Sequence, residues 1–406
     1  MKNRVPFKTY LIEIAFLLIF ASSLVLASQK AALSLESIQC PDYQGDKANK
    51  DILRGIHLLY DWRFNEAQSL FRKVIAEYPD KPIGYFYLAM VTWSHMASGF
   101  WSPVTIREYI ERLDCTIDVA KSRIESNSAD CYDFFYLGGA LGFKGRYNLI
   151  KGEWLSAFFL ATESVHALKA FLKMAPNNKD ILLGLGLFDY YTARLSGVLK
   201  ILSYLLIHRG NKQEGLRKLH VAAREGTYSA TEAKNMLLHI YLFLEQDFSN
   251  ALYLAKDLAT RYDKNPRFKL LLGVNYICLD MDAQYRNTVD HLRQRSLQAS
   301  SSKEASLWGK RALYLESIYD LFHGRNRGAR SKLREILNQA DPESDPAMIA
   351  WPLVKMGMSY NLEGNREEAT RYYRQILNME NGSGVQFLAK KLLHKPPKEK
   401  DPYIGY

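Results

Sequence analysis

The sequence predicts an all-α protein, an α-solenoid built of antiparallel helix pairs with irregular insertions. Between Asp51 and Pro79, apolar residues recur at helical intervals in two blocks, and a short polar stretch separates the blocks. The same pattern returns several times before the C-terminus, and no run of alternating apolar and polar residues reaches the length of a strand. A single helix pair cannot cover its own apolar face, so we expect stacked copies.

The clearest copy of the pattern is the stretch from Asp51 to Pro79. Gly55, Ala67, Phe71 and Pro79 fall where a helix–turn–helix repeat of about 34 residues has its small, small, aromatic and terminating residues. Small side chains let paired helices approach closely, and the aromatic ring fills the gap towards the next pair. The stretch therefore resembles a tetratricopeptide repeat.

Further copies follow along the chain. DILLG at residues 180–184 echoes DILRG at residues 51–55, and the stretch from Pro352 gives the second-clearest copy. The residues with a predicted packing role in these repeats are Gly55, Ala67, Phe71, Pro79, Gly138, Ala167, Phe171, Gly184, Gly357, Tyr360, Ala369 and Tyr373.

The middle of the chain departs from the repeat. HMASGFWSP at residues 95–103 is expected to form an aromatic loop before a long helix over residues 104–126. The apolar insertion Val198–Ile207 reads as a buried helix or as a helix lying on a membrane, and both readings stay open. Gly184 and Gly186 lie inside a predicted helix without a third glycine at the required place, so they indicate close helix packing rather than a nucleotide loop.

The resemblance to tetratricopeptide repeats spans roughly residues 48 to 393. It implies a TPR-like right-handed superhelix whose concave groove holds a peptide or a partner helix. Because insertions use part of the length, we expect about eight or nine helix pairs. The expected divisions are a linker at residues 28–47, helical regions at residues 48–207 and 208–393, and a flexible tail at residues 394–406.

The N-terminus has the plan of a secretory signal peptide over residues 1–27. Lys2, Arg4 and Lys8 precede an apolar run at residues 14–26, and small Ala27 offers a cleavage point. Glu13 cuts the run short of the roughly 20 residues that a spanning helix needs. Retention of residues 14–26 as a membrane anchor is the alternative. Either way the protein is expected to be exported, to the periplasm or cell envelope if it is bacterial.

Four cysteines are an even count, which permits disulfides in an oxidising compartment without establishing them. Cys115 and Cys278 sit in apolar helical patterns and are expected to be buried and inert.

The sequence carries no motif for nucleic-acid binding, metal binding, phosphate binding or catalysis. The net charge of +11 comes without a dense basic run with interleaved aromatics, so no nucleic-acid partner is predicted. The sequence contains no CxxC, no HExxH and no histidine pair at i, i+4, and it has no phosphate-loop motif. We therefore predict no metal, no cofactor and no catalytic residue.

Two function classes remain. The first is a non-enzymatic exported scaffold that binds a protein or peptide partner through the helical groove. The alternative is a helical substrate-binding module of an envelope enzyme that acts on peptide or glycan. Aromatic residues three or four positions from a packing glycine or alanine should face the groove, and the partner-binding hypothesis names Tyr60, Phe86, Trp93, Tyr132, Phe135 and Phe188.

Overall fold

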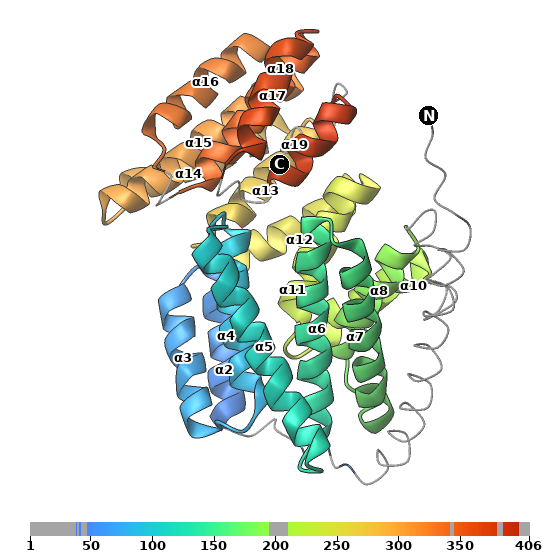
Figure 1. The fold of residues 1–406 in the computed structure, drawn as a ribbon. Helices are drawn as coiled ribbons and strands as arrows, with labels where there is room; N and C mark the ends of the chain where they lie inside the picture. Colours follow the sequence, from blue (N-terminus) through green and yellow to red (C-terminus); the bar gives the residue numbers. More distant parts are fainter. Residues whose placement is uncertain are drawn as a thin grey trace, which may run out of the picture.

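The computed structural model describes residues 38, 40–41, 47–194, 210–341, 345–379 and 385–397. In these ranges the regular elements are all helices, and no residue lies in a strand (Figure 1). The predicted signal segment 1–27, the insertion Val198–Ile207 and the tail beyond residue 397 lie outside the described residues. So does the boundary that we expected at residues 207/208.

The first half of the chain folds into antiparallel pairs, with short connections between consecutive helices over residues 47–192. Its helices are α2 (Lys47–Tyr60), α3 (Phe64–Glu77), α4 (Pro82–Ala97), α5 (Pro103–Glu125), α6 (Cys131–Lys151), α7 (Trp154–Met174), α8 (Ile181–Thr192) and α10 (Lys212–Glu225).

The second half continues the same arrangement. Its helices are α11 (Ala230–His239) with a π-helical turn (Ile240–Glu245), α12 (Phe248–Arg261), α13 (Pro266–Cys278), α14 (Asp282–Leu297), α15 (Ser302–Phe322), α16 (Asn326–Gln339), α17 (Ala347–Leu362), α18 (Arg366–Leu377) and α19 (Val385–His394). Helices adjacent in sequence pack on one another throughout the described chain. The fold is thus an all-α solenoid of tetratricopeptide-like hairpins.

The repeat residues lie where helices meet. A Cβ atom on Gly55 would stand 2.3 Å from Phe71, and one on Gly357 would stand 2.4 Å from Tyr373. No side chain fits at either place, which is why the small and aromatic residues come together. The remaining repeat residues also lie at helix contacts or turns. Those that are buried are Ala67, Phe71, Ala167, Phe171, Ala369 and Tyr373. Gly138 and Gly184 face Leu168, Tyr360 stacks on Tyr372, and the Pro79 carbonyl accepts a hydrogen bond from the Tyr85 hydroxyl.

The turn inside several hairpins repeats one backbone motif. The first helix ends in a residue with positive φ, and the next N–H reaches back five residues, as in Arg63 N to Leu58 O at 2.9 Å. Glycine is the usual residue at the positive-φ position because it has no Cβ. The occupants here are Trp62, Gly99, Gly152, Asp280, Gly324 and Gly364. Gln246 also has a positive φ, but the N–H that follows it reaches back six residues.

Several sequence expectations need correction. The last hairpin does not begin at Pro352: α17 starts five residues earlier at Ala347, and Pro352 lies inside it. The expected loop at residues 95–103 is shorter, because α4 runs on to Ala97. The third pair is longer than a standard repeat because both of its helices are long: α6 and α7 are 21 residues each.

The cysteines divide into a bonded pair and two free thiols. Cys40 and Cys131 form a disulfide with 5.2 Å between their Cα atoms, which ties the chain before α2 to the start of α6. Cys278 is partly buried, and burial raises its thiol pKa to about 12. Cys115 is exposed, so the expectation that it is buried was wrong. It sits one position from the buried face of α5, next to Thr116.

The solenoid folds back on itself. The helices α14–α19 gather at one end of the N-terminal helices (Figure 1). In the loop after α4, a Cβ atom on Gly99 would stand 2.6 Å from Ala347 of α17. On α2, the carbonyl of Tyr60 accepts a hydrogen bond of 2.8 Å from Asn265. The C-terminal ends of α2 and α4 therefore meet the later part of the same chain.

Candidate functional site

A cavity of about 280 Å³ lies where the two parts of the solenoid meet. Four of the six tryptophans and three arginines line it, and no described lining residue is an acid. Six segments contribute to the wall: the α2–α3 turn, α4 with its following loop, and helices α6, α13, α15 and α17. The lining side chains with an aromatic ring or a charge are Trp62, Trp93, Trp101, Tyr314, Trp351, Arg146, Arg267 and Arg311.

Two of the arginines stack on the tryptophans. The Arg146 guanidinium lies 4.8 Å from the ring centre of Trp93, and that of Arg311 lies 5.6 Å from the ring centre of Trp62. Such cation–π contacts fix both partners in place. They join α6 to α4 and α15 to the α2–α3 turn, so the rings present stable faces to the cavity.

Carboxylates behind the wall hold two of these arginines. Asp345 accepts two hydrogen bonds from Arg311, of 2.9 and 3.2 Å, and the buried Lys310 lies 3.6 Å away. Glu232 lies 3.8 Å from Arg146 and accepts a 2.7 Å hydrogen bond from the Tyr60 hydroxyl. Bidentate pairing fixes the plane of a guanidinium, and so sets which of its N–H groups can face a ligand.

Arg267 contacts a histidine. Nδ1 of His239 lies 2.7 Å from the Asn235 carbonyl, so Nδ1 carries the proton and donates. Nε2 then accepts from Arg267 at 2.8 Å. Burial, reinforced by Arg267, lowers the pKa of His239 to about 3, and the ring is neutral at ordinary pH. A neutral histidine thus orients this arginine.

Trp62 is the strained member of the wall. Its φ is +63°, a left-handed conformation that crowds any Cβ, and a bulky residue there is uncommon. Four other hairpins place glycine at the same point of the turn: Gly99, Gly152, Gly324 and Gly364. A left-handed non-glycine residue costs about 1–2 kcal/mol. The first hairpin bears this cost at Trp62, whose side chain lines the cavity.

Of the six predicted partner-binding residues, Trp93 lines this cavity. Tyr60 is covered by the chain itself: its ring lies 5.5 Å from Tyr262 and 6.4 Å from Phe268. Phe86 is 8% exposed and packs against Tyr136, so it is not accessible to a partner in this conformation.

The remaining three predicted residues pack in an apolar cluster between α6, α7 and α8, and two of them, Tyr132 and Phe135, also pack against the cluster that holds Phe86. Tyr132 and Phe135 pack on Phe171 with ring centres 5.6 and 5.2 Å apart, and Phe188 packs against the same cluster. The structure therefore does not bring the six residues together on one surface.

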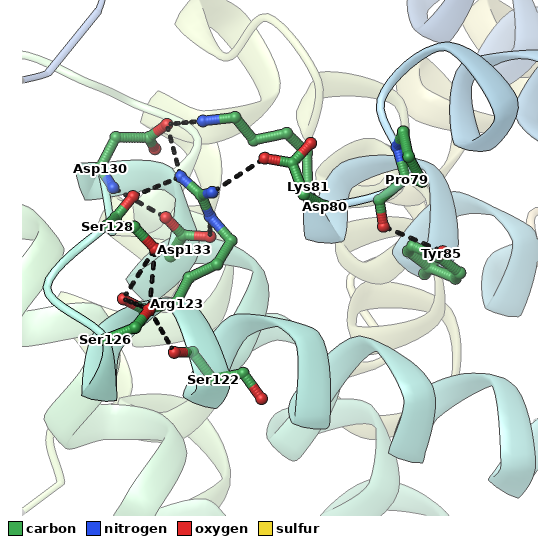
Figure 2. A network of polar contacts seen from close by, with 10 residues as sticks. All are labelled: Pro79, Asp80, Lys81, Tyr85, Ser122, Arg123, Ser126, Ser128, Asp130 and Asp133. Atoms are coloured by element: carbon green, nitrogen blue, oxygen red, sulfur yellow. Dashed lines mark hydrogen bonds and ion pairs between the residues drawn. The ribbon is translucent and has the colours of Figure 1, made fainter.

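A smaller cavity of about 90 Å³ lies between the starts of α2, α4 and α6. Beside it, the Arg123 side chain reaches Asp133 at 2.9 Å, Asp80 at 3.1 Å and the Ser128 carbonyl at 2.6 Å (Figure 2). Lys81 pairs with Asp130 at 2.7 Å. Burial and the nearby Asp130 raise the pKa of Asp133 to about 6. Because these charges bind one another, we interpret the cluster as a structural clamp between α4, α5 and α6.

Sequence reasoning missed most of the larger cavity. Its three arginines are spread from residue 146 to residue 311 and share no spacing. Trp62 did carry a signal, because it occupies the turn position that Gly364 occupies in the last hairpin.

Comparison with known proteins adds little. No family model matches the chain, and no curated protein matches it. Among solved structures it is similar to the TPR domain of P58(IPK), at 15% sequence identity and a TM-score of 0.22, over 86% of this chain and 88% of that one. So low a TM-score supports no inference, and the fold assignment rests on the helix packing described above.

The remaining site types to consider are a metal site and a membrane-spanning helix. No group of three or more His, Cys, Asp or Glu side chains in the described residues could hold a metal ion. Among the described helices, α7 alone is long and apolar enough to cross a membrane, and it packs along α6 as the second member of a hairpin. A core helix passes the same test of length and composition.

Proposed function

We propose that this protein is a non-enzymatic scaffold that binds a protein or peptide partner, and that the partner places a side chain in the tryptophan and arginine cavity. The observation that carries the proposal is the composition of the wall, with four tryptophans and three arginines around one hollow. Tryptophan, tyrosine and arginine are the residues that dominate binding energy in protein interfaces, and they do so in well-packed central pockets.

Cross-linking from inside the cavity tests this proposal. A photoreactive phenylalanine analogue would replace Trp101 in one variant and Trp351 in another, because these lining residues come from different segments, the loop after α4 and helix α17. The matched control replaces Tyr253 on α12, which is 75% exposed and away from the cavity. We expect the same partner from both cavity positions and none from the control.

Two cross-linking results would contradict the proposal. Cross-links only from position 253, with both cavity variants folded by circular dichroism, would contradict the proposal. Two unrelated sets of cross-linked products from positions 101 and 351 would also contradict it, since one bound partner should contact both residues.

The second part of the proposal is export, to the periplasm or envelope in a bacterium. The disulfide between Cys40 and Cys131 supports it, because disulfides persist in oxidising compartments. Fractionation followed by N-terminal sequencing checks it. A mature chain that starts after Ala27 indicates cleavage, and a membrane-bound chain with an intact N-terminus indicates the anchor. Full-length protein with reduced cysteines in the cytosol would refute export.

A further inference from the structure

The charges around the cavity are strongly unbalanced. Three arginines line it, and the buried Lys310 and Lys355 stand behind the wall near Asp345 and Trp351. Against these five cations, the ion pairs of the described residues set two carboxylates, Asp345 and Glu232, neither of which lines the cavity. Such an excess of positive charge favours an anion and disfavours a cation.

The hydrogen-bonding groups at the wall point the same way. Guanidinium and indole N–H groups only donate, so seven of the lining side chains offer donors without acceptors. A ligand that forms hydrogen bonds with these side chains must bring acceptors. A planar group with two or three oxygens matches the fork of an arginine. The tryptophan faces, together with Leu270 and Met348, leave room for a flat apolar body.

The strain at Trp62 is an independent observation. At this turn position glycine would relieve the backbone, and the other hairpins show that the fold accepts glycine there. Trp62 instead projects a ring that lies 5.6 Å from Arg311 and 5.8 Å from Phe64. Strain of this kind gathers at ligand sites, where the rest of the structure holds it in place.

We propose that the cavity binds an anionic group, a carboxylate or phosphate, carried on a flat apolar body, with the tryptophans around the body and the arginines around the anion. This inference rests on the proposed function in one respect, the use of the cavity as the contact site. The anionic group belongs to a partner protein or to a free small molecule, and the chemistry is the same for both.

Calorimetric titration of the whole protein with three matched probes tests the proposal. Naphthalene-2-carboxylate carries the anion, 2-naphthamide has the same shape without charge, and 2-naphthylmethylammonium carries a cation. We expect the carboxylate to bind at least tenfold more tightly than the amide, and the ammonium compound to show no binding. Equal affinity for carboxylate and amide would overturn the proposal.

Variants then locate the site. Arg267→Gln and Arg146→Gln should each weaken carboxylate binding about tenfold, whereas Arg217→Gln on the outer face of α10, where Arg217 pairs with Glu214, should leave it unchanged. Arg311 is left intact because its removal would strand the buried Asp345. Trp62→Gly should weaken binding about tenfold while the melting temperature stays the same or rises. If carboxylate affinity survives in the arginine variants, the binding is elsewhere and the proposal is wrong.

Competition separates this inference from the proposed function. If naphthalene-2-carboxylate blocks cross-linking of the partner from position 351, the anion belongs to the partner. If it binds and no partner cross-links from either cavity position, the site takes a free anion and the proposed function fails on its own. If the partner cross-links from the cavity but the carboxylate shows no preference over the amide, the anion inference fails and the scaffold proposal stands.

Discussion

Helix α2 of the first pair and helix α17 of the last carry the same contact, Gly55 against Phe71 and Gly357 against Tyr373. Their other faces differ. Segments after residue 228 cover α2, and Tyr60 at its end is sealed by Tyr262 and Phe268. The start of α17 instead borders the cavity with Ala347, Met348 and Trp351. The repeat therefore determines how a helix pair packs internally, and the closure of the solenoid determines which inner face can meet a ligand.

The largest effect should come from the shared contact. Ala67 and Ala369 are fully buried on the second helix of their pairs. Ala67→Arg and Ala369→Arg would each bury a charge and overpack the pair, and we expect each to lower the free energy of unfolding by about 4 kcal/mol. Urea denaturation measures this, with Ala76→Arg on the exposed side of α3 as the control, expected within about 0.5 kcal/mol of wild type.

A loss at only one of the two alanines would break the equivalence between the first and last pairs. A loss of similar size at Ala76 would show that the assay reports general damage rather than packing.

The next effect is a pH dependence of the folding stability that comes from the buried His239. The pKa of His239 is lowered to about 3, mainly by burial, whereas an unfolded histidine titrates near 6.5. Between these values the unfolded chain binds a proton that the folded chain does not, so stability falls as pH drops below about 6.5. We expect a loss of about 2 kcal/mol at pH 5 from this group.

His239→Gln tests that expectation, because glutamine can keep a hydrogen bond to Arg267 without titrating. The variant should lose less stability than wild type between pH 7 and pH 5 in the same urea assay. An unchanged acid dependence would mean that His239 is already exposed to water.

The smallest effect compares two tyrosines near the C-terminal ends of α2 and α17. The Tyr60 hydroxyl donates to Glu232 at 2.7 Å between covered surfaces, whereas Tyr360 is held by ring stacking with Tyr372 at 5.7 Å. Tyr60→Phe should cost about 1 kcal/mol, and Tyr360→Phe less than about 0.5 kcal/mol. Equal melting temperatures for the two variants would show that the cover over α2 is looser than described.

The fold was predictable because its information is local. Gly55 contacts Phe71 within a single hairpin, and Ala67 lies on the same second helix, so their spacing in the sequence specifies the hairpin. Pro352 misled because a proline often begins a helix, and here it lies in the sixth position of α17.

The cavity was not predictable in the same way. It forms only when Gly99 meets Ala347 and the α2–α3 turn meets α15, and contacts across some 250 residues leave no periodic trace in the sequence. Aromatic content suggested a surface in the first half of the chain. The ring at residue 86 is buried, and the half-buried rings at residues 132 and 135 pack on α7, because long helices such as α6 use them to pack against α4 and α7.

The central claim, that ligands enter between the first and last pairs, has one direct test. Fluorine NMR of protein labelled with 5-fluorotryptophan gives six signals, assigned by single Trp→Phe variants, and the sequence supplies its own controls. When the cross-linked partner is added, we predict that the signals of the four cavity tryptophans shift, while those of Trp154, exposed on α7, and Trp308, 1% exposed, stay in place. Shifts at Trp154 or Trp308 with the four cavity signals unmoved would contradict the claim.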